Sequence, residues 1–325
     1  MKRVGIIGLG EYLPERILTN LDLEKMVDTS DEWIITRTGI KTRHLVSHGQ
    51  AASDLATKAA KKALKDAKLL PADLDLIIVA TVTPDMQFPS TACLVQTRLK
   101  ADNAVCFDIS AACAGFVYAI IIAQQFIARG TYKKALIIGS EVLSSITDWK
   151  DRNTCVLFGD GAGAAVLAPV NSGGILSTYM GSDGSLGDLL MLPGGGSRCP
   201  TTHQSIDKGL HYIKMRGNEL FKIAVKIMAE AAQQALKLAN LECKDVDWVI
   251  PHQANTRILM SMAKKLGLSE KKIFLNIDKY GNMSSASTAT ALCEAVKSKC
   301  VKKGDIVLLD AFGGGLAWGA CVIKW

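Results

Sequence analysis

One of the nine cysteines stands in a setting suited to nucleophilic chemistry. Cys113 lies in the segment Asp-Ile-Ser-Ala-Ala-Cys-Ala-Gly-Phe (108–116), between a predicted strand at 105–109 and a helix predicted to begin at about 113. Small neighbours let a thioester approach the sulfur, and the N-terminus of a helix favours the thiolate. We therefore predict that Cys113 is a nucleophile that accepts acyl groups from thioesters. The other eight cysteines are expected to be structural, because free cysteines are commonly buried.

Two polar residues in the second half could complete such a site. His252, in Val-Ile-Pro-His-Gln-Ala-Asn, follows a predicted strand at 248–250, and Asn282 follows Tyr280-Gly281. A lone histidine is more often structural, and an asparagine after glycine is often only a turn residue. If both face Cys113, an imidazole and an amide that does not titrate can stabilise the oxygen of an enolate.

Glycines form three patterns that need separate interpretations. Gly313-Gly314-Gly315 follows a predicted strand at 306–311 and is either a tight turn or, with the Cys113 amide, an oxyanion hole. The patterns at 5–10 and 159–164 resemble dinucleotide-binding loops, but neither stands between a strand and a helix in the required register. We interpret the second pattern as close backbone packing.

The elements that must position these residues occur twice. A predicted helix, an Asp-x-Asp turn and an apolar strand occur at 53–80 and again at 218–250, with Asp73 and Asp245 lying 172 positions apart. Cys113 and Ser285 lie 172 positions apart as well, and the predicted strand at 273–277 then matches the strand at 105–109. The repeat predicts an α/β protein with two similar halves, residues 1–172 and 173–325, the first carrying Cys113 and the second His252 and Asn282.

Alternating strands and helices predict largely parallel sheets covered by helices. Sites in such sheets lie at the carboxyl ends of the strands, where Cys113, His252, Asn282 and the glycine run at 313–315 would all fall. Pseudo-symmetry would place Asn282 opposite Cys113 across one site.

Composition narrows the class of protein. The chain has 325 residues, of which 21% are charged and 49% hydrophobic, so it can bury a large core. A formal net charge of +7 is mild for this length; it does not indicate a nucleic-acid partner and suits acidic partners instead. No CxxC pair suggests a metal, and the most apolar run, 114–128, contains Gln124 and Gln125, so we expect a buried helix and no membrane span. A cytoplasmic protein with reduced thiols is expected.

The order Cys, His, Asn in these contexts resembles the thiolase superfamily, and most closely the beta-ketoacyl-acyl-carrier-protein synthase III family. The resemblance extends from Gly5 to Trp325. The motifs that carry it are Thr-Ser-Asp-Glu-Trp-Ile (29–34), Arg-Thr-Gly-Ile (37–40), Phe-Pro-Ser (88–90), the Cys113 segment, Phe-Gly-Asp-Gly-Ala-Gly (158–163), Pro-His-Gln-Ala-Asn (251–255), Tyr-Gly-Asn (280–282) and Phe-Gly-Gly-Gly-Leu-Ala-Trp-Gly (312–319).

The resemblance implies a thiolase-like duplicated fold in five αβαβα layers and a decarboxylating condensation. Cys113 would take an acyl group from acyl-CoA, with acetyl-CoA as the expected starter, and malonyl-acyl-carrier protein would lose CO2 to give an enolate held by His252 and Asn282. The amides of Cys113 and Gly314 would bind the oxyanion. No metal or other cofactor is implied beyond these substrates.

The resemblance also implies binding residues. CoA would be held by Thr29, Trp33, Arg37, Arg152 and Asn255, with Trp33 and Arg152 sandwiching the adenine. Phe88 would reach the acyl pocket of a partner subunit, which implies a homodimer. Lys222, Arg257 and Lys264 would form the basic patch that meets acyl carrier protein, although surface solvation is the plain alternative for each of these side chains.

Two other functions stay open at this stage. The chain could be a relative of the same fold that transfers acyl groups to other acceptors or loads the starter unit of a secondary metabolite, or a thiolase-fold protein without catalysis. The retained Cys113, His252 and Asn282 argue against the last. Met283, where a smaller residue is expected, and the loop at 189–197 leave the length and branching of the starter acyl chain open.

Overall fold

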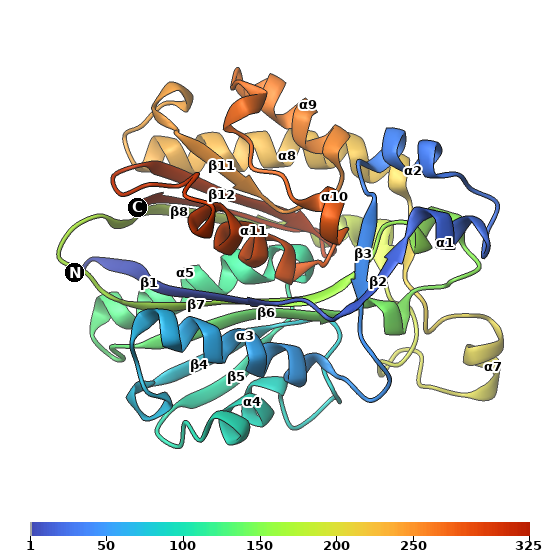
Figure 1. The fold of residues 1–325 in the computed structure, drawn as a ribbon, viewed down its shortest axis with the longest axis horizontal. Helices are drawn as coiled ribbons and strands as arrows, with labels where there is room; N and C mark the ends of the chain where they lie inside the picture. Colours follow the sequence, from blue (N-terminus) through green and yellow to red (C-terminus); the bar gives the residue numbers. More distant parts are fainter. Residues whose placement is uncertain (1) are drawn as a thin grey trace.

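The computed structural model describes residues 2–325 as five alternating layers of helices and sheets (Figure 1). Helices α3 (Ala52–Ala67) and α4 (Thr91–Leu99) cover the outer face of one sheet. Helices α5 (Gly115–Arg129) and α11 (Ser285–Lys297) lie between the two sheets, and α8 (Gly217–Leu238) and α9 (Thr256–Leu266) cover the outer face of the second. The predicted five-layered α/β fold is confirmed.

The first sheet has the strand order β1-β7-β6-β4-β5. Its strands are β1 (Val4–Tyr12), β4 (Leu76–Ala80), β5 (Val105–Ile109), β6 (Ala135–Val142) and β7 (Asp160–Pro169). The second sheet has the order β11-β12-β13-β8, built from β8 (Gly174–Ser182), β11 (Trp248–Pro251), β12 (Ile306–Gly313) and β13 (Ala317–Lys324). Read from the opposite end, the second order, β8-β13-β12-β11, matches the first four strands of the first sheet, β1-β7-β6-β4, and β5 has no counterpart. This correspondence is the duplication that the sequence offset predicts.

Strand directions differ from the prediction of largely parallel sheets. The pairs β4–β5, β4–β6 and β11–β12 are parallel, whereas β1–β7, β6–β7, β12–β13 and β8–β13 are antiparallel. Strand β13 follows β12 through a short connection, which antiparallel neighbours allow, whereas β1–β7 and β8–β13 pair strands that lie far apart in the sequence. The parallel strands remain those that lead to the predicted site.

The predicted strand at 273–277 does not form. Ile273 makes a single bridge to Val249, and residues 277–280 form the short helix α10 (Ile277–Tyr280). The side chain of Gln253 accepts hydrogen bonds from the backbone amides of Asn276 (3.0 Å) and Ile277 (3.2 Å). These amides therefore need no neighbouring strand, and the second sheet ends at β11.

Glycines let helix and sheet layers approach closely. A Cβ atom at Gly8 or Gly10 of β1 would lie 2.5 Å or 2.2 Å from a carbonyl oxygen of α3, and one at Gly163 of β7 would lie 2.5 Å from the Cβ of Ala289 in α11. Gly159–Gly163 therefore serves backbone packing, as predicted, and β1 leads to another strand rather than to a helix.

Within residues 2–325, one helix is long and apolar enough to cross a membrane, at Ala112–Arg129. It contains α5, whose side chains Phe116, Ile120 and Ile127 are fully buried in the cluster between the two sheets. The prediction of a buried helix is confirmed, and its position in the central layer accounts for its composition.

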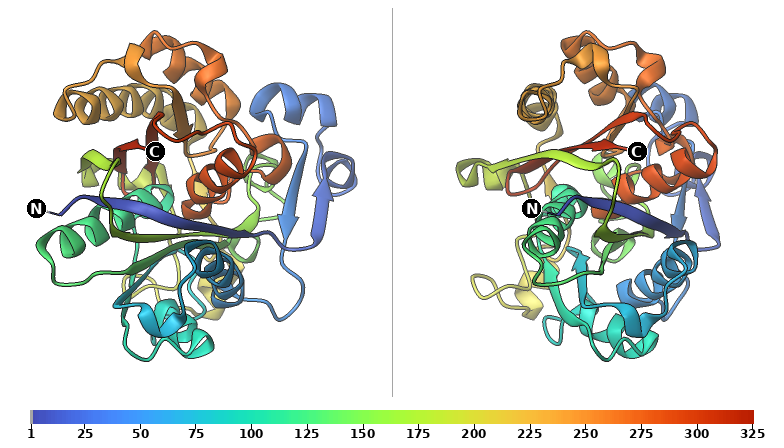
Figure 2. Two further views of the ribbon diagram at one scale, coloured as in Figure 1. Left: turned by 60° about the vertical axis from the view of Figure 1, so that its left-hand side comes forward. Right: turned by 90° about the vertical axis from the view of Figure 1, so that its left-hand side faces the viewer.

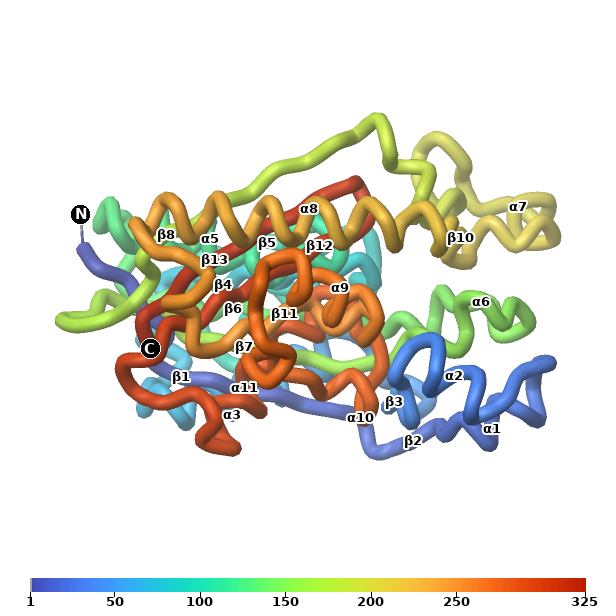
Figure 3. The backbone as a smooth tube through the Cα atoms, turned by 90° about the horizontal axis from the view of Figure 1, so that it is seen from above, coloured from blue at the N-terminus to red at the C-terminus, as the bar shows by residue number. Residues whose placement is uncertain are grey.

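Smaller elements gather at one end of the molecule, opposite the two termini (Figures 2 and 3). They are the hairpin β2 (Arg16–Thr19) and β3 (Thr42–Leu45), with α1 (Asn20–Glu24), α2 (Asp31–Thr38), α6 (Arg152–Cys155), α7 (His203–Asp207), β9 (Leu190–Met191) and β10 (Lys214–Met215). Gly39, after α2, has φ +83°, and a Cβ there would lie 2.0 Å from the Thr256 hydroxyl. This close approach packs a first-half segment against helix α9 of the second half.

The predicted division of the chain into two halves, between residues 172 and 173, falls between β7 and β8 and stays a prediction.

Candidate active site

Cys113 lies in a short 3-10 turn, Ala112–Ala114, that joins β5 to α5. The turn packs against the end of β12, where a Cβ on Gly313 would lie only 2.6 Å from the Cys113 backbone nitrogen. Side chains of any size at Gly313 would therefore displace the cysteine. The glycine run thus allows the end of β12 in the second half to contact the nucleophile segment of the first half directly.

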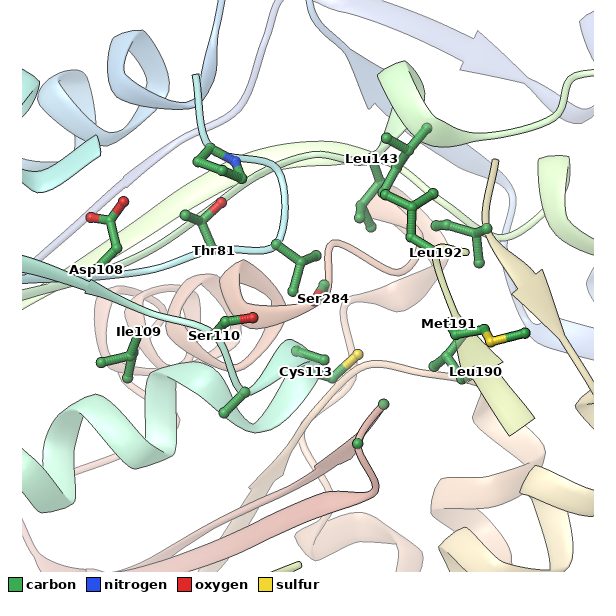
Figure 4. A pocket seen from close by; sticks show the side chains of 18 of the residues that line it. Thr81, Asp108, Ile109, Ser110, Cys113, Leu143, Leu190, Met191, Leu192 and Ser284 are labelled. Atoms are coloured by element: carbon green, nitrogen blue, oxygen red, sulfur yellow. The ribbon is translucent and has the colours of Figure 1, made fainter. Parts of the chain in front are cut away.

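A cavity of about 730 Å³ opens beside Cys113. Figure 4 shows the sulfur pointing into it, with Ser284 from the segment before α11 beside it and Leu190–Leu192 across from it. The apolar lining includes Val82, Leu143, Ile146, Phe158, Leu190 and Ile213. Gly314 also lines the cavity, so its backbone is on the same side of the thiol as the space that an acyl group would occupy.

His252 begins the loop after β11, as predicted. Its backbone amide donates to the carbonyl of Asp310 in β12 (2.7 Å), which extends the parallel pairing of the two strands by one residue. The side chain is 1% exposed, and its Nδ1 has no hydrogen-bond partner within residues 2–325. Its Nδ1 is therefore a buried polar atom that the described residues leave unsatisfied.

Asn282 is held by backbone hydrogen bonds to the first half. Its amide donates to the Leu157 carbonyl (2.9 Å), and its carbonyl accepts from the Gly159 amide (3.0 Å). Its side-chain oxygen accepts from the Ser284 amide (2.9 Å), an arrangement that leaves the NH2 group of the side chain as the donor. The side chain is 8% exposed, so this donor faces a largely dry environment.

Burial determines the resting protonation of the thiol and the imidazole. It raises the pKa of Cys113 to about 12 and lowers the pKa of His252 to about 3. The site therefore rests as a neutral thiol and a neutral imidazole. The expectation that the helix N-terminus favours a thiolate is wrong for this resting state, because desolvation outweighs the dipole of α5.

Three predicted CoA-binding side chains form a cluster. The Arg152 guanidinium carbon lies 4.9 Å from the centre of the Trp33 ring, and that of Arg37 lies 6.0 Å from it. Arg152 also donates to the carbonyl of Asp28 (2.7 Å). A base stacked between Trp33 and Arg152 needs room for a further layer, so the sandwich predicted from the sequence requires Arg152 to swing away from the ring.

The remaining predicted CoA-binding residues have structural contacts of their own. Asn255 is the N-cap of α9, accepting from the Arg257 amide (2.8 Å), and its NH2 donates to the Arg37 carbonyl (2.9 Å). The hydroxyl of Thr29 is buried and has no partner among the described residues. Of these two side chains, Thr29 is the one whose polar atom lacks a hydrogen-bond partner among the described residues.

The other predicted binding residues lie on the surface. Phe88 is 84% exposed, which is extreme for a large apolar side chain. Lys222 on α8 and Lys264 on α9 are exposed, and the Arg257 guanidinium lies 5.6 Å from the centre of the Phe221 ring, between the two helices. Lys222 and Arg257 therefore lie near the contact between α8 and α9, and their meeting with acyl carrier protein, together with that of Lys264, stays a prediction.

Sequence reasoning missed two residues beside the nucleophile. Ser284 lines the cavity with a positive φ of 45°, and its buried hydroxyl has no hydrogen-bond partner within residues 2–325. Glu141 is fully buried at the end of β6. The available signal for Glu141 is a carboxylate in the otherwise uncharged run Ala-Leu-Ile-Ile-Gly-Ser-Glu-Val (135–142), whereas Ser284 in a run of small residues gives no comparable signal.

Comparisons with known proteins agree with this architecture. Residues 107–184 match the family model of 3-oxoacyl-[acyl-carrier-protein (ACP)] synthase III, and residues 236–325 match the model of its C-terminal part. The chain is 60% identical to the beta-ketoacyl-[acyl-carrier-protein] synthase III of Caldanaerobacter subterraneus subsp. tengcongensis over 99% of its own length and 97% of that protein. It is 55% identical to the synthase III of Clostridioides difficile, over 99% and 98% of the two chains.

Solved structures extend the likeness to the whole fold. The 3-oxoacyl-[acyl-carrier-protein] synthase III from Aquifex aeolicus superposes with a TM-score of 0.92 at 51% identity, covering 99% of this chain and all of that one. The priming beta-ketosynthase of the R1128 polyketide pathway superposes equally well, with a TM-score of 0.92 at 34% identity, over 99% and 96% of the two chains.

A duplicated five-layered fold with a cysteine at the strand ends between its halves defines a thiolase-like condensing acyltransferase. Its likeness to the curated relatives covers the full length of the chain. The chain belongs to the beta-ketoacyl-[acyl-carrier-protein] synthase III family.

Proposed function

We propose that this protein carries out the initiating condensation of fatty acid synthesis through an acyl-Cys113 intermediate, with acyl-CoA, such as acetyl-CoA, and malonyl-acyl-carrier protein as substrates. The observation that carries the proposal is the Cys113 thiol directed into a largely apolar cavity at the junction of the two halves. An apolar space beside a nucleophilic sulfur suits an acyl chain.

In the first half-reaction, the sulfur attacks the thioester carbonyl of acyl-CoA and CoA leaves as its thiol. The thiol proton must depart as attack proceeds, because burial keeps the resting thiol protonated. Backbone amides of Cys113 and Gly314 would hold the oxyanion of the tetrahedral intermediate. Because the residues at 313–315 are glycines, the end of β12 can lie close to the Cys113 backbone, as an oxyanion hole formed by both segments requires.

In the second half-reaction, the malonyl thioester loses CO2 and leaves an enolate. The neutral His252 imidazole and the Asn282 amide would donate to the enolate oxygen. The carbanion then attacks the acyl-Cys113 carbonyl, the C–S bond breaks to release the beta-ketoacyl product, and the Cys113 thiolate takes up one proton from solvent to restore the thiol. These steps use only side chains and backbone amides of the chain together with its two substrates and that proton.

A homodimer is part of the proposal. Strand β5 is at the edge of the first sheet, and its first residue, Val105, is 48% exposed. Met86 and Phe88, on the loop leading to α4, are 47% and 84% exposed. A second copy of the chain would cover these apolar side chains and the open edge. The sedimentation coefficient of the purified protein tests this assembly.

Acyl carrier protein would dock on the face formed by α8 and α9, where Lys222, Arg257 and Lys264 present positive charge to an acidic partner. We place the protein in the cytoplasm, where its nine cysteines, all free in the structure, would stay reduced.

Charge reversal at this face should discriminate between the two substrates. Lys222→Glu is expected to lower kcat/KM for malonyl-acyl-carrier protein by roughly three- to tenfold at low salt, because it places like charges opposite each other. The rate of Cys113 acylation by acyl-CoA should change much less. Lys237→Glu is the matched control, since it makes the same change of charge at an exposed position near the far end of the same helix. Equal losses in the two variants, or equal losses for both substrates, would contradict the docking face.

The proposed function is tested with radiolabelled acetyl-CoA, with and without malonyl-acyl-carrier protein. Label should appear on Cys113 with acetyl-CoA alone and move to carrier protein, with release of CO2, when the malonyl partner is added. Label that stays on the enzyme without release of CO2 would overturn the condensation.

The resemblance to the R1128 priming ketosynthase favours one alternative, a condensing enzyme that starts a secondary metabolite. The higher identity to curated fatty-acid relatives, 60% against 34%, favours the first function. A panel of straight and branched acyl-CoA starters, assayed with the carrier protein of fatty acid synthesis and with those of polyketide synthesis, separates the two.

A further inference from the structure

Glu141 places a buried carboxyl group close enough to Cys113 to affect the pKa of the thiol. It is 0% exposed at the end of β6, and no basic side chain contacts it among the described residues. Its Oε2 accepts hydrogen bonds from the Val82 amide (3.0 Å), the Thr83 hydroxyl (2.8 Å) and, at a longer distance, the Thr81 hydroxyl (3.3 Å). A buried carboxylate without a cation is costly, so its protonation state needs an explanation.

The hydrogen bonds on the other oxygen identify that state. The Ser285 hydroxyl oxygen lies 2.8 Å from Oε1 of Glu141 and also 2.8 Å from the carbonyl oxygen of Ala80. A serine hydroxyl has one proton, and a backbone carbonyl can only accept. If Ser285 donates to Ala80, its contact with Oε1 is a hydrogen bond only when Glu141 carries the proton. The protonated acid is the form that satisfies both contacts.

The partners of Glu141 come from the segments that surround Cys113. Thr81 and Val82 line the cavity on the first-half side, and Ser285 follows Ser284, which lines it on the second-half side. Thr83 links the acid further to the backbone, since its hydroxyl accepts from the Val142 amide (2.8 Å). Glu141 therefore ties the wall after β4 to the start of α11, which follows Asn282.

Few charged side chains among the described residues lie near the carboxyl group of Glu141. The groups that face it from β4, the following loop and α11 are hydroxyls and a backbone amide, and the titratable group coupled to it is the Cys113 thiol on the turn before α5. Asp160, on the neighbouring strand β7, directs its carboxylate at the amides of Val46 and Ser144 instead. Burial raises the pKa of Glu141, and a negative charge there would add to burial in raising the pKa of Cys113.

We propose that Glu141 is a positioning residue that works as a neutral carboxylic acid, donating to Ser285 and accepting from Val82 and Thr83, so that the segment after β4 and the start of α11 are held together without a negative charge near Cys113. Its effect on activity rests on the proposed nucleophilic role of Cys113. Its protonation does not, and can be measured separately.

The first test is infrared spectroscopy of the whole protein at neutral pH. Glu141 should contribute to the C=O stretching band of protonated carboxylic acids, and the contribution should vanish in Glu141→Gln. Burial also raises the pKa of Asp310, so Asp310→Asn serves as the control that removes a different part of this band. If the difference between wild type and Glu141→Gln shows a carboxylate band instead, the proposal is overturned.

The second test is the condensation assay on two variants. A glutamine amide can donate to Ser285 and accept from Val82 and Thr83, so Glu141→Gln is expected to retain kcat/KM within about threefold. Glu141→Ala removes all of these bonds and should lower kcat/KM by at least about tenfold. Rescue by glutamine distinguishes a neutral hydrogen-bonding role from a requirement for charge.

Each remaining outcome is decisive. If Glu141→Gln loses as much activity as Glu141→Ala, a neutral acid is not sufficient and the proposal fails. If Glu141→Ala does not fold, the comparison of wild type with Glu141→Gln still decides between rescue and loss. If Cys113 is not acylated even in the wild type, the proposed function fails, while the infrared result still decides the protonation of Glu141.

Discussion

Cys113→Ser is expected to lower the condensation rate at least about a thousandfold and to abolish the acyl-enzyme detected by mass spectrometry. A serine hydroxyl is a far weaker acid than a thiol, and burial already raises the pKa of the native thiol to about 12. His252, whose pKa burial lowers to about 3, is too weak a base to compensate. The serine oxygen would therefore stay protonated and unreactive.

The control for this substitution is another cysteine. Cys300→Ser changes a thiol to a hydroxyl near the end of the chain, away from the cavity lining, and should retain the acyl-enzyme and its activity. Thermal denaturation of both variants checks that the fold is kept. Condensation by Cys113→Ser at the wild-type rate would remove Cys113 from the mechanism.

His252→Ala and Asn282→Asp are expected to lower decarboxylation and condensation by about 100- to 1000-fold each, with a smaller effect on acylation of Cys113. Both side chains are proposed to donate to the enolate oxygen, which exists only after CO2 leaves. Asn282→Asp is preferred to alanine, because aspartate keeps the oxygen that accepts from the Ser284 amide, whereas it replaces the NH2 donor with a carboxylate oxygen that repels the enolate. Labelled CO2 from the malonyl substrate measures the second half-reaction directly.

His48→Ala is the matched control for the histidine, since His48 is exposed whereas His252 is buried at the end of β11. Acylation by labelled acetyl-CoA, measured in the same preparations, separates the two half-reactions. If acylation and decarboxylation fall equally in His252→Ala and Asn282→Asp, these residues act before the enolate forms, and their proposed roles are wrong.

The duplicated fold could be predicted from the sequence, and the sequence also gives Cys113, His252 and Asn282 as candidates whose roles stay predictions. Helical and strand periodicities are local, so they could be compared across an offset of 172 positions without knowledge of the tertiary structure. The motifs around Cys113, His252 and Asn282 are local as well, and each falls in the structure after a strand or in the segment that repeats one. Family membership, which the comparisons establish, followed from the same motifs.

Other features depend on partners distant in the chain. Residues 273–277 have the composition of a strand. The Gln253 side chain, however, accepts the hydrogen bonds of the Asn276 and Ile277 amides, and the sheet ends at β11. A local pattern cannot reveal whether a neighbouring strand or a distant side chain will supply the hydrogen bond. The antiparallel pairs of each sheet were missed for a related reason, because strand direction depends on how connections pack in three dimensions.

The sequence by itself determined the α/β class, the repeat and the identity of the candidate nucleophile, because these follow from residue type and spacing. Only the tertiary structure decided that Cys113 rests as a neutral thiol and that Arg152 lies against Trp33. It also decided that Glu141 is fully buried near Cys113. Desolvation depends on all the layers that enclose a group, and those layers come from both halves of the chain. The chemistry of the cleft is therefore a property of the assembled halves, whereas its main residues can be read in each half separately.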